Sequence, residues 1–256
     1  MIITTEGIVL KQKSIAGNRR MITVFTKSYG KISAGTTISE RGKSKSALSI
    51  RPFTFAEYEI FKGRDSYNIN NAQVRRSFFS IGENLDRFMI ASKLMEYLND
   101  VLAEGKPATR LFDLTIEFFE TISKAESGFD TILYAYIAKS LRILGISPEL
   151  KCCVNCGKPL YEFFENSKIR TPYLFSVTAG GILCEQCGER VKTNSQILIK
   201  RPSFDIVEVL NYFQNKPLGN FEKVNLKIDI KDEVRVILNE YLSYYLDTDV
   251  LNDSLI

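Results

Sequence analysis

Two pairs of cysteines are the feature that most restricts what this chain can fold into. Cys153 and Cys156 form the first pair, Cys184 and Cys187 form the second, and a glycine follows each pair. A C-x-x-C spacing places two thiolates at neighbouring corners of a tetrahedron, and two such pairs separated by a hairpin-length insert form a closed zinc site. The sequence therefore predicts a four-cysteine zinc-ribbon module over residues 150–190 that holds one structural Zn²⁺.

The residues around the cysteines predict the local structure of this module. Gly157 and Gly188 are expected to adopt positive-φ turns that let backbone N–H groups point at sulfur. The segments 163–165 and 173–176 are rich in aromatic residues and predict strands. The glycine pair at 180–181 predicts the turn that leads back into the second cysteine pair.

Cys152 directly precedes the first pair and leaves one alternative open. It would replace Cys153 as a ligand through a C-x₃-C spacing, but the two-residue spacing matches that of the second pair. Four thiolates leave no open position for water, which argues against a catalytic zinc ion. Disulfides or a thioredoxin-type redox pair are less consistent with two pairs that are each followed by glycine.

Two residue types are absent from the chain, and their absence restricts its chemistry. There is no histidine, which excludes mechanisms that use a histidine base or a histidine metal ligand. There is no tryptophan either, so a surface that stacks on nucleobases has to use Phe, Tyr or Arg. No cluster of carboxylates suited to Mg²⁺ is recognisable, and the sequence predicts a protein that is not an enzyme.

Composition and hydropathy are those of an ordinary globular protein, with 45% hydrophobic and 25% charged residues. No stretch approaches the roughly 18 apolar residues that would indicate a membrane-spanning helix. Residues 1–6 lack the basic and apolar regions of a signal peptide. We expect a cytoplasmic protein without a membrane association, in which cysteines bind metal rather than form disulfides.

Charge is distributed unevenly along the chain. The first 80 residues contain 14 lysines and arginines against 5 aspartates and glutamates, whereas the remaining 176 residues contain 20 against 25. A basic first third joined to an acidic remainder favours contact between that first third and a polyanion. A solvated basic face without a partner is the alternative.

Residues 1–80 contain short apolar segments separated by turn residues, as in β-structure. The strongest segments span residues 8–10, 21–26, 31–34 and 53–61. Strands of this length and spacing predict a small closed barrel. The basic and polar run at residues 40–46 predicts a mobile loop.

From about residue 81 the apolar period changes to that of helices. Five apolar stripes predict the core-facing sides of a helical bundle, and the third stripe ends at Gly145. The stripes are Phe88, Ala91, Met95, Leu98 and Leu102; Leu111, Leu114, Phe118 and Ile122; Leu133, Ile137, Leu141 and Leu144; Ile206, Val209, Leu210 and Phe213; and Val234, Ile237, Leu238, Tyr241 and Tyr245.

The simplest architecture is an α+β multidomain protein. A barrel occupies residues 1–80, and a helical bundle domain is formed by residues 81–149 together with residues 191–256. The zinc-ribbon module at 150–190 is inserted between these two helical parts.

Short motifs are spread over nearly the whole chain. They are Glu6–Lys11, Thr23–Ile32, Arg51–Thr54 and Leu141–Gly145, followed by the two cysteine pairs with Phe175–Ser176 and Gly180–Gly181 between them. Their order and spacing together are specific, and they resemble those of one family, RecO, whose members are bacterial recombination mediators and DNA-annealing proteins.

The resemblance implies a specific fold and function. The barrel is expected to be an OB-fold, and the protein is expected to bind single-stranded and double-stranded DNA and to anneal complementary strands. The partners implied are RecR and the single-stranded DNA-binding protein SSB, with RecA loaded indirectly onto SSB-covered DNA. A protein of this function would associate with the nucleoid.

The basic residues of the first third are the candidates for phosphate contact, which is independent of sequence and sensitive to salt. They are Lys11, Lys13, Arg19, Arg20, Lys27, Lys31, Arg41, Lys43, Lys45, Arg51, Lys62 and Arg64. Among the aromatic residues, we expect Phe25, Phe53, Phe55 and Phe61 in the barrel core. Tyr29, Tyr58 and Tyr67 are better candidates for stacking on bases.

Two other classes of protein remain as alternatives. A zinc-ribbon transcription or translation factor would use the ribbon itself to contact nucleic acid or protein, but charges in residues 150–190 are almost balanced. A zinc-stabilised nuclease would need a carboxylate cluster or a general base of the usual kind, and neither is recognisable.

Overall fold

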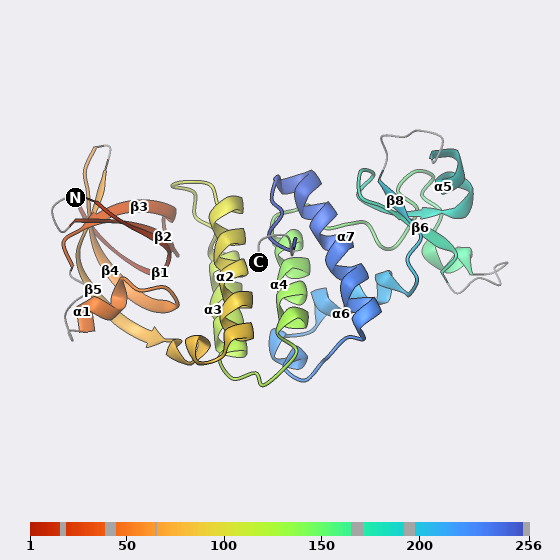
Figure 1. The fold of residues 1–256 in the computed structure, drawn as a ribbon. Coiled ribbons are helices and arrows are strands. Elements are labelled where there is room, and N and C mark those ends of the chain that lie inside the picture. Colours follow the sequence, from red (N-terminus) through yellow and green to blue (C-terminus); the bar gives the residue numbers. More distant parts are fainter. Residues whose placement is uncertain (16–18, 39–44, 65, 165–170, 192–197, 253–256) are drawn as a thin grey trace. The chain divides into compact units, whose positions relative to one another are not determined.

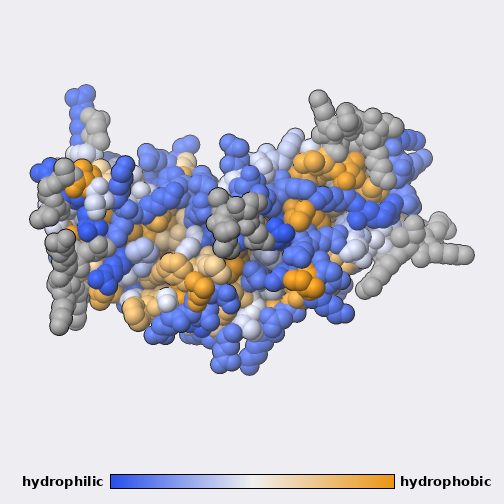
Figure 2. Space-filling view, in the orientation of Figure 1, coloured by the Kyte–Doolittle hydropathy of each residue, from blue (hydrophilic) through white to orange (hydrophobic). Residues whose placement is uncertain are grey.

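The computed structural model divides the chain into two compact units, Met1–Ala125 and Glu126–Ile256. The residues that it describes are 1–15, 19–38, 45–64, 66–164, 171–191 and 198–252 (Figure 1). Within these ranges, none of the helices is both long and apolar enough to cross a membrane. Hydrophilic residues cover most of the face shown in Figure 2.

The first unit begins with a closed five-stranded barrel in the order β1-β2-β3-β5-β4. Neighbouring strands are antiparallel except for β3 and β5, which are parallel and close the barrel. A short helix, α1, lies between β3 and β4, which completes the OB-fold arrangement. The elements are β1 (Ile2–Ser14), β2 (Arg20–Thr26), β3 (Gly30–Thr36), α1 (Lys45–Ser49), β4 (Thr54–Lys62) and β5 (Tyr67–Ser77).

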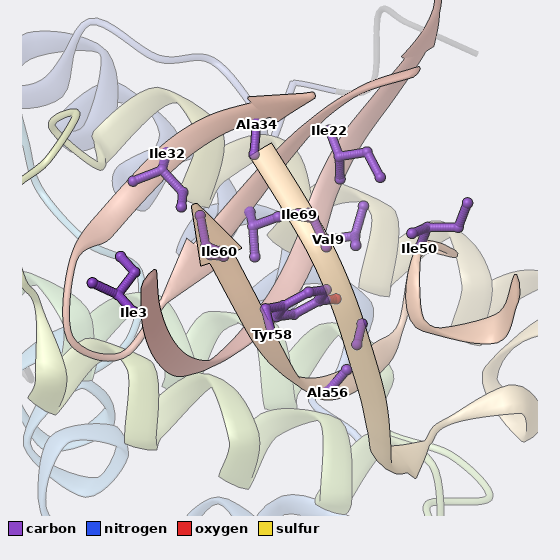
Figure 3. Close-up of a cluster of buried hydrophobic side chains, with 12 residues drawn as sticks. Ile3, Val9, Ile22, Ile32, Ala34, Ile50, Ala56, Tyr58, Ile60 and Ile69 are labelled. Atoms are coloured by element: carbon purple, nitrogen blue, oxygen red, sulfur yellow. The ribbon is translucent and has the colours of Figure 1, made fainter. Parts of the chain in front are cut away.

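The interior of the barrel is filled by alternate residues of every strand (Figure 3). On β4, Ala56, Tyr58 and Ile60 point inward and are fully buried, as the period of two residues requires. The Tyr58 hydroxyl donates a hydrogen bond of 2.6 Å to the carbonyl oxygen of Ser49 at the end of α1. Ile50, which follows α1, belongs to the same core, so this hydrogen bond and this side chain join the helix to the barrel.

Two elements of the barrel were not predicted from the sequence. Strand β5 has weak apolar alternation because asparagines occupy positions 68, 70 and 71, and only Ile69 and Ala72 of this strand belong to the barrel core. Residues 45 and 46 were predicted to lie in a mobile loop, yet they form the first turn of α1. The rest of that basic run, residues 40–44, lies outside the described residues.

An apolar row on the outer surface of the barrel packs against a helix of the same unit. Ile8 on β1 pairs with Phe25 on β2 and with Phe55 on β4. The rings of Phe25 and Phe55 lie 5.2 Å and 6.2 Å from that of Phe112, which belongs to α3 (Thr109–Ile122). The prediction that Phe25 and Phe55 fill the barrel interior was therefore wrong, because both face outward and contact α3, Phe25 fully buried and Phe55 partly buried.

A second aromatic cluster joins β4 to the helices that follow the barrel. Phe53 and Phe78 both contact Phe119 of α3, with ring centroids 5.9 Å and 5.6 Å apart. Phe53 also contacts Phe88 on α2 (Leu85–Val101) at 5.6 Å. Phe88 remains 43% exposed, so it lies at the edge of the predicted stripe rather than in its centre. A 3-10 helix, η1 (Phe79–Glu83), leads from β5 into α2.

The second unit combines helices with a small sheet. Helix α4 contacts both α6 and α7, and Gly145, with φ of 78°, provides the left-handed residue that ends α4. The sheet has the strand order β7-β6-β8. The elements are α4 (Phe129–Ile143), η2 (Leu160–Phe163), β6 (Tyr173–Ser176), β7 (Gly181–Cys184), α5 (Glu185–Val191), β8 (Ile199–Lys200), α6 (Ile206–Asn215), η3 (Leu218–Phe221) and α7 (Ile228–Leu246).

The boundary between the compact units falls between α3 and α4. It therefore lies within residues 81–149, the predicted first part of the helical domain. Helices α2 and α3 group with the barrel, whereas α4 groups with α6, α7 and the small sheet. The barrel strands end at Ser77, close to the predicted limit at residue 80.

Replacing Tyr58 with Phe tests the junction between α1 and the barrel. The change leaves the buried carbonyl oxygen of Ser49 without this donor, and we expect it to lower the free energy of unfolding by about 1–2 kcal/mol. Urea denaturation of the two proteins measures the difference. Tyr161→Phe, at a residue that is 69% exposed, is the matched control and should leave stability unchanged. Equal stability of Y58F and the unchanged protein would contradict the assigned role of this hydrogen bond.

Candidate metal centre and nucleic-acid interface

Four cysteine side chains from two separate segments meet in the second unit. Cys153 and Cys156 lie in the loop after α4, whereas Cys184 ends β7 and Cys187 lies in the first turn of α5. Their four Sγ atoms all lie within 4.8 Å of one another. Cys153, Cys184 and Cys187 are buried and Cys156 is exposed. The sequence prediction thus named four residues that the fold brings together, in an arrangement that could hold a metal ion.

Backbone hydrogen bonds hold the first cysteine segment against the β6–β7 hairpin. The N–H of Val154 donates to the carbonyl of Ile182 at 2.9 Å. The N–H of Ile182 donates in turn to the carbonyl of Glu149 at 3.0 Å. Within the first pair, the Cys153 N–H bonds the Lys158 carbonyl at 2.8 Å and closes the turn that carries Cys156. The positions of the sulfur atoms are therefore set by backbone contacts on both segments.

The surroundings of the sulfur atoms favour the thiolate form of Cys153 and oppose the thiolate form of Cys184. Burial acts to raise the pKa of Cys153, but hydrogen bonds from the backbone N–H groups of Cys184, Cys156 and Asn155 outweigh it and lower this pKa to about 7. Burial raises the pKa of Cys184 to about 12. The Asn155 side chain donates a hydrogen bond of 3.3 Å to Cys187 Sγ. A divalent cation would offset the cost of burying these thiolates together.

Two expectations about the module need correction, and the question left open about Cys152 receives an answer. Gly157 has the predicted positive φ, 75°, but Gly188 lies inside α5 and lacks one. Gly188 is needed for space, because a Cβ there would lie 2.5 Å from Leu174 Cδ1. Residues 160–163 form the 3-10 helix η2 where a strand was predicted to begin at residue 163. Cys152 is half-buried, forms a bridge with Pro159 and is not one of the four clustered cysteines.

Tyrosine hydroxyls attach the small sheet to the helices of the same unit. Tyr173 on β6 donates to Asp205 Oδ1 at 2.7 Å, and the same carboxylate oxygen accepts the Glu208 N–H at the start of α6. On α7, Tyr241 donates to the carbonyl of Ile146 at 3.0 Å. Tyr173 thereby fixes the hairpin that carries Cys184 to the start of α6, and Tyr241 fixes α7 to the chain that follows α4.

Four of the predicted phosphate-binding residues lie at one part of the barrel surface. Lys11 and Lys13 are exposed on β1, where they pair with Thr23 and Met21 of β2. Arg19 and Arg20 lie at the start of β2, and the carbonyl of Arg19 accepts a hydrogen bond of 2.8 Å from the N–H of Ile15. The end of the β1–β2 hairpin is therefore strongly basic.

A pocket of about 520 Å³ lies beside these basic residues. It is formed where β2, β3 and β5 approach one another, and its polar residues include two asparagines that sequence reasoning missed. The lining includes Arg19, Arg20, Met21, Gly35, Asn68 and Asn70. The asparagines gave no signal in the sequence because β5 itself was not recognised as a strand. Their position next to Arg20 follows only from the pairing of β3 with β5.

Two other predicted lysines face the helices instead. Lys27 Nζ lies 3.0 Å from Asp113 on α3 and 3.9 Å from Glu6. The hydrogen bond and charge of Asp113 raise the pKa of Lys27. Lys31 Nζ donates a hydrogen bond of 2.6 Å to the Asn99 carbonyl on α2. Both lysines therefore contribute to the contact between the barrel and its helices.

The remaining predicted basic residues are spread over other parts of the first unit. Lys62 ends β4, and its ammonium lies 5.8 Å from the centre of the Tyr67 ring. Arg64 is exposed in the turn that follows, and Arg51 is exposed after α1. Arg41 and Lys43 lie outside the described residues, and Lys45 is described only as the first residue of α1.

The aromatic residues differ from expectation. Tyr58 is fully buried in the barrel core, so its prediction as a stacking residue was wrong. Phe61 was predicted to lie in the core, but it points outward from the end of β4 and is 44% exposed. Tyr29 and Tyr67 are half-buried at the edge of the core. Phe61 was misjudged because it follows the apolar Ile60. The sequence alone does not show which of these two neighbours points into the barrel.

Comparison with known proteins finds matches over nearly the whole chain. The family model "Recombination protein O N terminal" matches residues 1–78, and "Recombination protein O C terminal" matches residues 82–252. The DNA repair protein RecO of Caldanaerobacter subterraneus subsp. tengcongensis is 30% identical over 247 residues, covering 96% of this chain and 94% of that protein. The DNA repair protein RecO of Alkaliphilus metalliredigens is 29% identical over 247 residues, covering 96% and 95%.

These matches extend over both the barrel and the unit that carries the cysteines. The DNA repair protein RecO of a Thermoanaerobacter species is likewise 30% identical over 250 residues, covering 96% of this chain and 93% of that protein. The chain therefore belongs to the RecO family of DNA repair proteins.

Proposed function

We propose that this protein is a recombination mediator that binds single-stranded and double-stranded DNA and anneals complementary strands. It acts with RecR on DNA covered by SSB and thereby promotes the loading of RecA. The observation that carries the proposal is the basic end of the β1–β2 hairpin on a closed OB-fold barrel, in a chain of the RecO family. Its site of action is the bacterial cytoplasm, at the nucleoid.

Annealing by such a surface requires no covalent chemistry. Fixed positive charges such as Lys11, Lys13 and Arg19 neutralise phosphates and release the counterions that had screened them. Two strands held in this way repel each other less, so complementary bases meet more often. Since contacts to phosphate carry no sequence information, the same surface serves any DNA sequence.

The four clustered cysteines are proposed to hold one structural Zn²⁺. Thiolates are the preferred ligands of zinc in closed tetrahedral sites, and the sulfur atoms lie within 4.8 Å of one another. When bound, the ion would cross-link the loop after α4 to β7 and α5. Its contribution is to folding, because four protein ligands leave no position for a substrate.

The main alternative assigns nucleic-acid or protein contact to the zinc module itself, as in a transcription or translation factor. The two functions differ in which unit carries the DNA-binding charges. The basic end of the β1–β2 hairpin belongs to the unit of residues 1–125, whereas the zinc module belongs to the unit of residues 126–256. The alternative would be favoured if substitution of the charged residues of the module abolished DNA binding while substitution of the basic residues of the barrel left it unchanged.

The annealing of two complementary labelled oligonucleotides coated with SSB tests the proposed function most directly. We expect the protein to accelerate annealing without ATP, and we expect the acceleration to fall steeply with added salt because phosphate contacts exchange with ions. Strands coated with SSB alone provide the control. No acceleration at low salt, with or without RecR, would contradict the proposal.

Replacing Arg41, Lys43 and Lys45 together with Ala tests the basic segment at residues 41–45. If each contacts a phosphate, the slope of log affinity against log salt for single-stranded DNA should decrease by about 2. Fluorescence titration at several salt concentrations measures the slope. The matched control replaces three exposed lysines of the other unit, Lys216, Lys223 and Lys227. An unchanged slope in the first triple variant would remove this segment from the interface.

Zinc content measured by mass spectrometry tests the metal site. The protein is expected to carry one zinc ion per chain, and Cys184→Ser should lose it because three thiolates bind far more weakly. Chelation should lower the melting temperature of the unchanged protein. Cys152→Ser is the matched control and should keep its zinc. If C152S lost the metal while Cys153→Ser retained it, the ligand assignment would move to Cys152.

A further inference from the structure

A continuous row of residues crosses the outer surface of the barrel at the basic end of the β1–β2 hairpin. Strand pairing places Lys13 beside Met21, Met21 beside Gly35, and Gly35 beside Asn68. The row continues from Asn68 to Phe61. Directly paired residues point to the same side of a sheet, and the inward neighbours Ile22, Ala34 and Ile60 are buried. The row therefore faces outward across four neighbouring strand pairs.

Gly35 makes a notch in the middle of this row. Its backbone does not have the positive φ that would require glycine, so the absence of a side chain is the feature that matters. A Cβ at this position would lie 2.9 Å from Asn68 Oδ1. Met21, on one side of Gly35, is 39% exposed, and Phe61, which lies beyond Asn68 on the other side, is 44% exposed. The Asn68 amide thus lies close over Gly35 and makes the notch polar on that side, whereas the Met21 side is apolar.

The notch opens into the pocket of about 520 Å³ described above, a volume within the range of roughly 300–1,000 Å³ usual for small-ligand sites. Asn68 and Asn70 offer amide donors and acceptors in it, and Arg19 and Arg20 provide positive charge. A nucleobase has the matching properties: an apolar face, a polar edge and an attached phosphate. A carboxylate side chain of a protein partner would use the arginines and amides but would leave the apolar Met21 side without a matching group.

The charge pattern of the same outer surface supports an anionic ligand at this end. Glu6 pairs with Glu57 across β1 and β4, and Glu59 lies two residues further along β4. Two of these carboxylates are ion-paired, Glu57 with Arg75 at 2.8 Å and Glu6 with Lys27 at 3.9 Å. A phosphate backbone is therefore attracted to the Lys13 and Arg19 end of the row, and the exposed Lys62, which follows Phe61, adds a positive charge at the other end.

We propose that the Gly35 notch accepts one unstacked nucleobase of a single strand, between Met21 and Asn68, and that Phe61 stacks on a neighbouring base. This inference rests on the proposed DNA-binding function and adds a chemical preference to it. Bases in a duplex are paired and stacked, so they cannot enter the notch without being extruded. The row is therefore the part of the barrel that distinguishes single-stranded from double-stranded DNA, whereas the surrounding cations bind both.

Binding of two oligonucleotides with equal charge tests the notch. One is an oligothymidylate and the other has the same length but lacks bases at its central positions. The unchanged protein should bind the first about tenfold more tightly, because stacking on a single base contributes about that much. Gly35→Leu fills the notch and should remove this preference while leaving affinity for the abasic strand and for duplex DNA unchanged. Gln73→Leu, at an exposed position of β5 that pairs with Glu57, is the matched control.

A second variant keeps the test valid if G35L fails to fold. Met21→Ala with Phe61→Ala removes exposed side chains and should also reduce the preference for the base-bearing strand. In the unchanged protein, 2-aminopurine at the central position should change its fluorescence on binding, and this change should be absent in G35L. Equal preference in G35L and the unchanged protein would overturn the notch while leaving the DNA-binding proposal intact. Absence of salt-sensitive binding to either strand would instead overturn the proposed function.

Discussion

The pairing of β3 with β5 is the interaction on which the barrel depends. It joins only three residue pairs, from Ala34–Tyr67 to Thr36–Ile69, and it is parallel in a sheet that is otherwise antiparallel. Without it, the five strands would form an open sheet with two unpaired edges and a core exposed on one side. The hydroxyl of Thr36 strengthens the junction by donating to the carbonyl of Ile69. The same pairing places Gly35 beside Asn68 and so creates the notch.

Closure of the barrel also divides its outer surface into parts with different chemistry. The row formed by Phe55, Ile8 and Phe25 packs against α3. Lys27 contacts α3 as well, and Lys31 contacts α2. Further along β2 and β3 the surface is open to solvent and bordered by Lys13 and Arg19. One sheet thus supports a structural contact at one end and a candidate ligand surface at the other. The strand register decides which residue serves which purpose.

Much of this could be predicted from the sequence because the signals were local. The cysteine spacing identified all four clustered residues, and the helical stripes located the helices because a period of 3.6 residues persists over several turns. Features that depend on long-range pairing were missed. Strand β5 lacks a clear apolar alternation, and the faces of Phe25 and Phe61 are decided by partners on other strands. A lysine that binds phosphate and a lysine that pairs with Asp113 look alike in the sequence.

The cysteine cluster has a consequence for the length of the chain between its two halves. Cys156 and Cys184 are 28 positions apart in the sequence, yet their Sγ atoms lie 3.8 Å from each other. The entropy lost on closing such a loop grows only with the logarithm of its length, so doubling the loop costs about 0.6 kcal/mol. Lengthening the chain between Cys156 and Cys184 would therefore add little to the entropic cost of bringing these two sulfur atoms together. The geometry of the four sulfur atoms therefore depends on the two short cysteine segments, Cys153–Cys156 and Cys184–Cys187, far more than on the amount of chain between them.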